Sequence, residues 1–189
     1  MSRLQGKYAL ITGASQGLGL QLAIEFARQR TTGVAIVARG AELLQKAHDL
    51  IREAAPETKV LTIVADLSQP QDIERIVATT LNEFEGHLDI LVNNASELGP
   101  SPMPFLLDYP LEDFHNVLNT NLIAPFLLIK KVLPAMIRKR RFDYQCHQRC
   151  RHYRLSRLGR VWNLEVWTRR TVANLGSRTR REQGSRQLG

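Results

Sequence analysis

Three glycines near the start of the chain have the spacing of a phosphate-binding turn. In the segment ITGASQGLG (residues 11–19), Gly13, Gly17 and Gly19 follow a short apolar run and precede an amphipathic one. At this spacing Gly13 permits a tight turn, Gly17 lets the backbone approach a pyrophosphate, and Gly19 lets the helix pack on the strand. Free N–H groups at the start of that helix would then bind the phosphates. An ordinary strand-to-helix turn is the alternative interpretation of the glycines alone.

Three further motifs follow the glycine turn along the chain. They are Ala65, Asp66 and Leu67, then NNAS at residues 93–96, then TNLIAPF at residues 120–126. Together with TGASQGLG, they resemble in order and spacing the motifs of the short-chain dehydrogenase/reductase family. The resemblance covers about three quarters of the chain and stops at about Arg140. It departs from the family pattern at Ser96, where the family has glycine.

The resemblance implies a role for each of these positions. Asp66 would bond to the adenine amino group of a nicotinamide dinucleotide, and Leu67 would contact the base. Asn93 and Ala95 would line the ribose side of the cofactor. Asn121, the one catalytic residue that can be carried over, would hold a proton-relay water through its own main chain. The alternatives are an Asp that caps a helix, strand-end amides in a turn, and an Asn on the surface.

The glycine turn and the end of the second expected strand bear on which dinucleotide is bound. Ser15, Gln16 and Leu18 lie between the glycines and complete the expected cofactor-binding turn. An Asp at the end of the second strand would bond the ribose 2′-OH and select NAD, but the sequence has Arg39 there. A guanidinium can pair bidentately with a 2′-phosphate, which favours NADP over NAD. Arg39 as a solvated cap is the alternative, and Gln16 stands where NADP-preferring relatives often have a basic residue.

The resemblance also implies a Ser, a Tyr and a Lys that this chain does not match. In the family, the Tyr exchanges a proton with the substrate oxygen, and a Lys four residues later lowers the phenol pKa. A Ser roughly a dozen residues before the Tyr polarises the carbonyl. None of the four tyrosines, Tyr8, Tyr109, Tyr144 and Tyr153, has a Lys at the fourth following position. We therefore expect the chain to be catalytically incomplete.

The composition of the chain changes abruptly near Arg140. Residues 1–140 contain 14 Lys and Arg against 15 Asp and Glu, whereas residues 141–189 contain 12 Arg, no Lys and 3 acids. The net charge of +8 therefore belongs wholly to the last 49 residues. Neither a helical nor a strand period lasts there for more than a turn. We expect residues 141–189 to be an Arg-rich, disordered tail outside the family.

A one-base change of reading frame accounts for this tail. Trp has a single codon, TGG, so in the next frame both Trp162 and Trp167 must become glycine. With allowed codons throughout, residues 141–167 can be re-read as VLIINVTSDAGITGYPGWGAYGTSKFG. That string has an apolar run, a Ser, and then Y-G-T-S-K at the family spacing. We hypothesise that a frameshift near codon 141 replaced the catalytic segment.

Two other functions compete with the oxidoreductase. The 12 arginines of the tail would bind the phosphates of a nucleic acid in a salt-dependent way, but no recognition motif accompanies them. Cys146, His147, Cys150 and His152 are candidate zinc ligands, but their spacing fits no common C-x₂-C pairing. We therefore expect no metal site and no specific nucleic-acid partner.

The candidate cofactor residues require elements that bring them to one edge of a sheet. Apolar runs predict strands at residues 8–12, 34–38, 59–66 and 89–95. Amphipathic stretches predict helices at residues 17–30, 41–54, 71–84 and about 112–139, the last with Pro125 and Pro134 as kink positions. A loop is expected at residues 96–105. Alternating strands and helices indicate a parallel sheet that is covered on both faces.

The predicted fold class is therefore α/β, a Rossmann-like doubly wound parallel sheet whose C-terminal part is incomplete. Residues 1–140 would form the NAD(P)-binding domain of an oxidoreductase for a small-molecule alcohol or carbonyl substrate. No run approaches 18 apolar residues and no apolar leader opens the chain, so we expect a cytoplasmic protein without a membrane partner. The resemblance implies a homo-oligomer for intact relatives.

Overall fold

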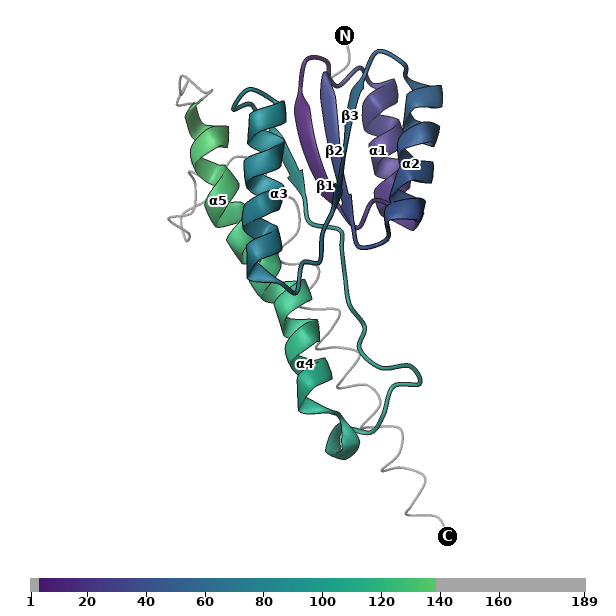
Figure 1. The fold of residues 1–189 in the computed structure, drawn as a ribbon, viewed down its shortest axis with the longest axis vertical. Coiled ribbons are helices and arrows are strands. Elements are labelled where there is room, and N and C mark those ends of the chain that lie inside the picture. The colour runs from purple at the N-terminus through teal and green to yellow at the C-terminus, as the bar shows by residue number, and fades with distance from the viewer. Residues whose placement is uncertain (1–3, 139–189) are drawn as a thin grey trace, which may run out of the picture.

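A four-stranded parallel sheet forms the centre of the molecule (Figure 1). The computed structural model describes residues 4–138, so the predicted tail and its frameshift lie outside the described residues. The strands are β1 (Tyr8–Thr12), β2 (Gly33–Ala38), β3 (Lys59–Val64) and β4 (Ile90–Val92). Their order in the sheet is β3-β2-β1-β4, with every neighbouring pair parallel. All four strands were predicted, although β3 and β4 end earlier than expected.

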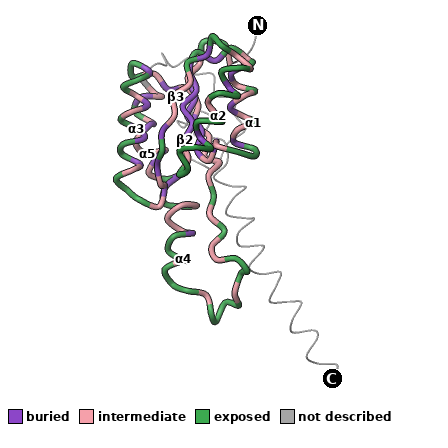
Figure 2. Tube along the Cα trace, turned by 45° about the vertical axis from the view of Figure 1, so that its right-hand side comes forward, coloured by how far each residue is buried: buried purple, intermediate pink, exposed green. Residues whose placement is uncertain are grey.

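Helices cover both faces of this sheet (Figures 1 and 2). One face carries α1 (Gly17–Arg28) and α2 (Ala41–Ala54), and the other carries α3 (Pro70–Glu83) and α5 (Ala124–Arg138). The predicted Rossmann-like α/β fold is thereby confirmed. Pro70 is the first residue of α3, where its missing N–H costs no helical hydrogen bond.

Strand residues alternate between two hydrophobic cores. Leu10 of β1 and Val37 of β2 face the core beneath α3 and α5, together with Leu128 and Val132 of α5. The next residues along the strands, such as Ile11 and Ile36, face the core beneath α1 and α2. Because successive side chains of a strand point to opposite sides, strands buried on both faces read as continuous apolar runs.

Hydrogen bonds join the starts of β1 and β4 although they lie far apart in the sequence. The carboxylate of Asp89 accepts a bond from the Tyr8 amide at 3.0 Å and pairs with the Lys7 ammonium at 3.1 Å. The Asp89 amide in turn donates to the Tyr8 carbonyl at 2.9 Å. β4 therefore enters the sheet beside β1 and not beside β3. Among the described residues, no strand pairs with the other edge of β4.

The long helix expected from about Glu112 to Lys139 is interrupted. It consists of α4 (Leu111–Leu118), a π-helix over Asn119–Ile123, and α5, and Lys139 lies outside the described residues. The interruption immediately precedes Pro125, which has no amide proton to donate to a carbonyl four or five residues back. Pro134 lies inside α5, which continues through it.

The combined helical segment Leu111–Ile137 is, among the described residues, long and apolar enough to span a membrane by length and composition alone. The segment has 27 residues, and an 18-residue stretch within it has a mean hydropathy of 1.4, with 22% of that stretch buried. The sequence has no run of 18 consecutive apolar residues, which was the criterion used above. That criterion misses this segment, because a membrane span tolerates an occasional charged residue. In the fold, Ala124, Leu128 and Val132 pack against the sheet core, as residues of a core helix do.

α4 and the loop before it extend away from the sheet (Figure 2). This region carries large apolar side chains in solvent, among them Leu107, which is 98% exposed. Phe105, Leu106 and Leu111 are exposed as well. Apolar surface of this kind is usually covered by another element or another molecule.

Candidate functional site

A cleft of about 410 Å³ opens at the carboxyl ends of the strands. It lies where the strand order reverses. The chain adds β2 and β3 on one side of β1 and then returns to add β4 on the other side. In open parallel sheets, this is the position where ligands bind. The walls are the glycine turn after β1, the ends of β2 and β3, and the segment after β4.

The glycine turn has the backbone that its sequence predicts. Gly13 and Gly17 have φ angles of +65° and +58°, a region that L-residues other than glycine rarely adopt. The Gly13 amide donates to the Val37 carbonyl at 2.8 Å, which holds the turn against β2. A Cβ on Gly13 would lie 2.7 Å from the Ala95 Cα, whereas one on Gly17 would meet nothing within 4 Å. The turn is therefore packed on the side of β4 and open at Gly17.

Asn94 connects the glycine turn to the segment after β4. Its side-chain amide donates to the carbonyls of Thr12 and Gly13, at 3.0 and 2.9 Å. In return, the Thr12 hydroxyl accepts the main-chain amides of Asn94 and Ala95, both at 3.1 Å. Sequence reasoning did not single out Asn94, although it stands in the NNAS motif beside two residues that were chosen.

The side chain of Asn93, unlike that of Asn94, has a buried atom that makes no hydrogen bond within the described part of the chain. Its side-chain oxygen Oδ1 is buried and has no hydrogen-bond partner among the described residues. A buried acceptor without a donor is unfavourable by roughly 1–3 kcal/mol. A group that supplies a donor at this position would remove that penalty.

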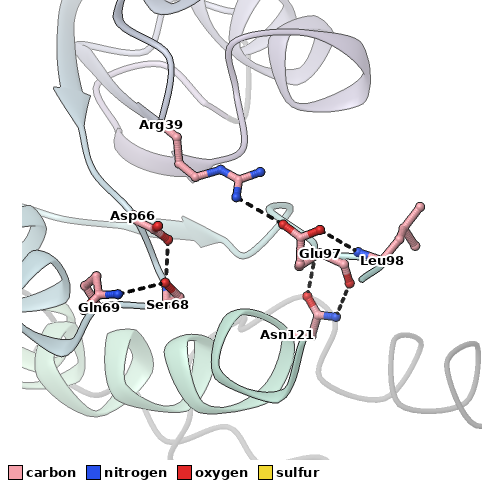
Figure 3. Close-up of polar contacts among 7 residues, drawn as sticks. All are labelled: Arg39, Asp66, Ser68, Gln69, Glu97, Leu98 and Asn121. Carbon is pink, nitrogen blue, oxygen red and sulfur yellow. Dashed lines mark hydrogen bonds and ion pairs between the residues drawn. The ribbon is translucent and has the colours of Figure 1, made fainter. Parts of the chain in front are cut away.

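Asp66 follows β3 and lies on the wall of the cleft. Its carboxylate accepts the Ser68 amide at 2.9 Å (Figure 3), which closes a short turn ahead of α3. The N-cap position of α3 is Gln69, so Asp66 is not the capping residue of that helix. The Asp66 amide donates to the carboxylate of Asp72 at 2.6 Å. This bond and, to a smaller extent, the Arg75 guanidinium lower the pKa of Asp72.

Asn121 lies in the π-helix and holds the segment after β4 in place (Figure 3). Its side-chain nitrogen donates to the Glu97 carbonyl at 2.6 Å, and its side-chain oxygen accepts the Glu97 amide at 2.8 Å. Because Pro125 has no N–H, it donates to neither the Asn121 nor the Thr120 carbonyl. The Asn121 side chain is thus bonded to Glu97, whereas its main-chain carbonyl receives no hydrogen bond from Pro125.

Arg39 follows β2 and reaches across the cleft to Glu97. Its Nη1 lies 3.1 Å from the Glu97 carboxylate (Figure 3), and its side chain is 67% exposed. The guanidinium is therefore both ion-paired and largely in solvent, which is compatible with either interpretation of this residue. Glu97 was not among the predicted site residues, because nothing in its own neighbourhood in the sequence indicates a partner in Arg39.

The predicted cofactor residues divide into two groups by position. Those that line the cleft are Gly13, Ser15, Gln16, Arg39, Asp66, Leu67 and Ala95. Those that stand outside its lining are Gly17, Leu18, Gly19, Asn93 and the catalytic candidate Asn121. The lining also includes residues for which no cofactor contact was predicted, namely Val37, Ala38, Gly40, Leu43, Ala65, Asn94, Ser96, Glu97 and Thr120.

The two tyrosines of the described region are poor proton-transfer groups. Tyr8 lies at the amino end of the sheet, where its ring contacts Phe84 at 4.9 Å between centroids. Burial raises the pKa of Tyr109, and the charges of Asp113 and Glu97 raise it further. A tyrosine that exchanges protons near neutral pH needs the opposite shift. Tyr144, Tyr153 and the candidate zinc ligands Cys146, His147, Cys150 and His152 lie outside the described residues.

Comparison of the sequence with known proteins identifies relatives of this chain. A family model described as short chain dehydrogenase matches residues 7–142. The 1-deoxy-11-beta-hydroxypentalenate dehydrogenase of Streptomyces arenae is 34% identical over 143 residues, which are 76% of this chain and 49% of that protein.

Solved structures give the same result. An NAD⁺-bound xylitol dehydrogenase superimposes with a TM-score of 0.65 and 31% identity over 72% of this chain and 50% of that one. The L-sorbose reductase of Gluconobacter frateurii, in complex with NADPH and L-sorbose, has a TM-score of 0.67 and 29% identity over 73% and 51%. The chain therefore spans about half the length of the proteins it resembles.

Proposed function

Because this chain belongs to the short-chain dehydrogenase family, we propose that residues 1–140 form the NAD(P)-binding domain of an oxidoreductase for an alcohol or carbonyl substrate. The observation that carries this proposal is the cleft at the point beside β1 where the strand order reverses, between the glycine turn and the segment after β4. Its position and its glycine-lined wall suit an extended dinucleotide.

The residues around the cleft fit such a group. The amides that follow Gly13 and open α1 would hold the pyrophosphate, and Gly17 leaves the space for it to approach. Asp66 and Leu67 would bind the adenine, and Asn93 and Ala95 the ribose side. Asn93 stands outside the lining of the cleft and its Oδ1 is buried, so a cofactor hydroxyl would reach this atom only after a local rearrangement. When bound, a nicotinamide dinucleotide gives a hydride to a carbonyl carbon or takes one from an alcohol.

NADP is the proposed cofactor, with NAD as the alternative. The argument rests on Arg39, the only cationic side chain among the described residues that line the cleft. A guanidinium binds a 2′-phosphate, whereas a ribose with a free 2′-OH is better served by a carboxylate. Among the similar structures, the xylitol dehydrogenase contains NAD⁺ and the L-sorbose reductase contains NADPH.

We propose further that the chain binds its cofactor but lacks the groups for turnover. Asn121 would provide a main-chain site for a relay water, yet no Tyr in the 189 residues is followed by a Lys at the fourth position. A one-base frameshift near codon 141 explains this absence. Among the described residues, the outer edge of β4 is unpaired and the loop before α4 exposes apolar side chains, which predicts poor solubility and weaker cofactor binding than in intact relatives.

Two glycine substitutions test cofactor binding with a matched control. Gly17 and Gly86 both have positive φ, and a Cβ on either would meet nothing within 4 Å, but Gly86 lies at the opposite end of the sheet from the cleft. Gly17→Ala and Gly86→Ala should therefore lose similar stability, about 1 kcal/mol from the backbone conformation. Only Gly17→Ala should weaken NADPH binding, by about tenfold, because its methyl group stands where the pyrophosphate approaches.

NADPH fluorescence titration of the full chain gives the dissociation constants. Equal effects of the two substitutions, or no binding to the unaltered chain, would refute the proposal. Catalytic incompleteness is tested separately with NADPH and a panel of ketones and aldehydes. Measurable turnover by the purified chain would overturn it. Sequencing the gene around codon 141 decides the frameshift, which is wrong if the next frame lacks Y-x-x-x-K at the expected place.

A further inference from the structure

The ion pair between Arg39 and Glu97 spans the cleft from one wall to the other. Arg39 follows β2 and Glu97 follows β4, and β1 lies between those two strands in the sheet. The pair therefore passes over the end of β1, where the glycine turn begins. The two side chains point toward each other (Figure 3), and both line the cleft, so their charges act on whatever binds there.

Glu97 is held in this position by two main-chain hydrogen bonds and by one hydrogen bond to its carboxylate. Its main-chain amide and carbonyl are both bonded to the Asn121 side chain. Its Oε1 accepts the Leu98 amide at 3.2 Å, which leaves Oε2 to pair with Arg39 at 3.1 Å. The Glu97 side chain is 26% exposed, less than half the exposure of Arg39. The carboxylate is thus the more fixed partner, and the guanidinium is the one that can turn away.

The acids of the cleft counteract the attraction that Arg39 offers to an additional phosphate. Of the lining residues within the described part of the chain, Arg39 is the one cation, and Asp66 and Glu97 are acids. A 2′-phosphate carries up to two negative charges, so it would have to draw Arg39 away from Glu97 and lie near a fixed carboxylate. A ribose with a free 2′-OH meets neither obstacle, because a hydroxyl can donate to a carboxylate.

We propose that Glu97 is a specificity-determining residue for the cofactor, whose carboxylate competes with a 2′-phosphate for the guanidinium of Arg39. The inference rests on the proposed binding of a nicotinamide dinucleotide in this cleft. It predicts that Arg39 alone does not set the preference for NADP, and that Glu97 moves the preference toward NAD. Removing the Glu97 charge should free Arg39 for the phosphate while leaving its main-chain bonds to Asn121 intact.

The test compares Glu97→Gln with Arg39→Gln, the double variant, and Glu57→Gln. Glu57 precedes β3 at the end of the sheet away from the cleft, so its substitution removes the same charge elsewhere. Exposed ion pairs are weak, and Glu97→Gln should therefore tighten NADPH binding by about two- to fivefold. NADH binding should change by less than about twofold, and Glu57→Gln should change neither. In the Arg39→Gln background, Glu97→Gln should lose most of its effect on NADPH.

Titration of 2′,5′-ADP and 5′-AMP by calorimetry repeats the comparison with probes that lack nicotinamide. The inference is supported if the gain is confined to the ligand with a 2′-phosphate and requires Arg39. It is overturned if Glu97→Gln affects both ligands of a pair equally, affects neither, or acts without Arg39, and the proposed function stands in all three cases. If the unaltered chain binds no dinucleotide, the proposed function fails and the inference fails with it.

Discussion

Gly19 provides a direct measure of how closely the glycine turn is packed. An alanine Cβ at this position would fall on the Gly13 carbonyl oxygen and 2.5 Å from the side-chain nitrogen of Asn94, whereas ordinary contact begins at 3.4 Å. α1 would have to move by about 1 Å, or Asn94 would have to leave its carbonyl partners. Overpacking of this size destabilises by about 1–3 kcal/mol, and weakened Asn94 hydrogen bonds add about 1 kcal/mol. The better helix propensity of alanine offsets about 1 kcal/mol.

We therefore expect Gly19→Ala to lower the free energy of unfolding by about 2 kcal/mol. Urea unfolding of the full chain, followed by circular dichroism, measures this loss. Gly40→Ala is the control. Gly40 is the N-cap residue of α2, which follows a strand as α1 does, but a Cβ at Gly40 would meet nothing within 4 Å. It should change stability by at most about 0.5 kcal/mol. A Gly19→Ala protein as stable as the unaltered chain would refute the reasoning about this contact.

Three further substitutions examine the supports of the cleft. Asp72→Asn should cost about 1 kcal/mol at pH 7. Because the pKa of Asp72 is lowered in the fold, this stabilisation is present above its ordinary pKa near 4 and disappears as the pH falls through the lowered value. In urea unfolding, the difference in stability between the variant and the unaltered chain should therefore be larger at pH 7 than at pH 3. A difference independent of pH would contradict this. Leu128→Ala should cost about 2–5 kcal/mol in the same assay, since the side chain is fully buried, and a loss below 1 kcal/mol would mean that α5 is not part of the core. Asn121→Ala removes both bonds to the Glu97 backbone and should speed hydrogen exchange of the Glu97 amide by about tenfold, whereas unchanged exchange would show that the loop is held by other contacts.

The strands and the first three helices were predictable because each has a strong local signal. Ile11, Ile36 and their neighbours form apolar runs too short for a helix, with turn residues at their ends. The end of β4 was less predictable. Asn93 and Asn94 directly follow β4, but the Asn94 side chain bonds across to Thr12 and Gly13, contacts that no local pattern reveals.

The interruption of the long helix was only partly predictable. Pro125 indicated a kink, but a proline in a helical pattern does not reveal whether the preceding turn becomes a π-helix. That outcome is accompanied by the two bonds between Asn121 and Glu97, which join residues 24 positions apart. The Arg39–Glu97 pair was not predicted, because its two residues are also far apart in the sequence. They meet only when β2 and β4 lie on either side of β1.

The strand order also determines when the cleft can form during folding. β1 pairs with β2 through residues such as Ala9 and Val34, which are close in sequence, but it pairs with β4 through Ala9 and Ile90. The longer loop raises the entropic cost of closure by about 1 kcal/mol. During synthesis, β1, β2 and β3 can associate before β4 has left the ribosome, and the Asp89 bonds to Lys7 and Tyr8 then fix the late strand. The binding cleft is thus completed by the most distant pairing in the sheet, and we expect it to be the last part of the domain to acquire its structure.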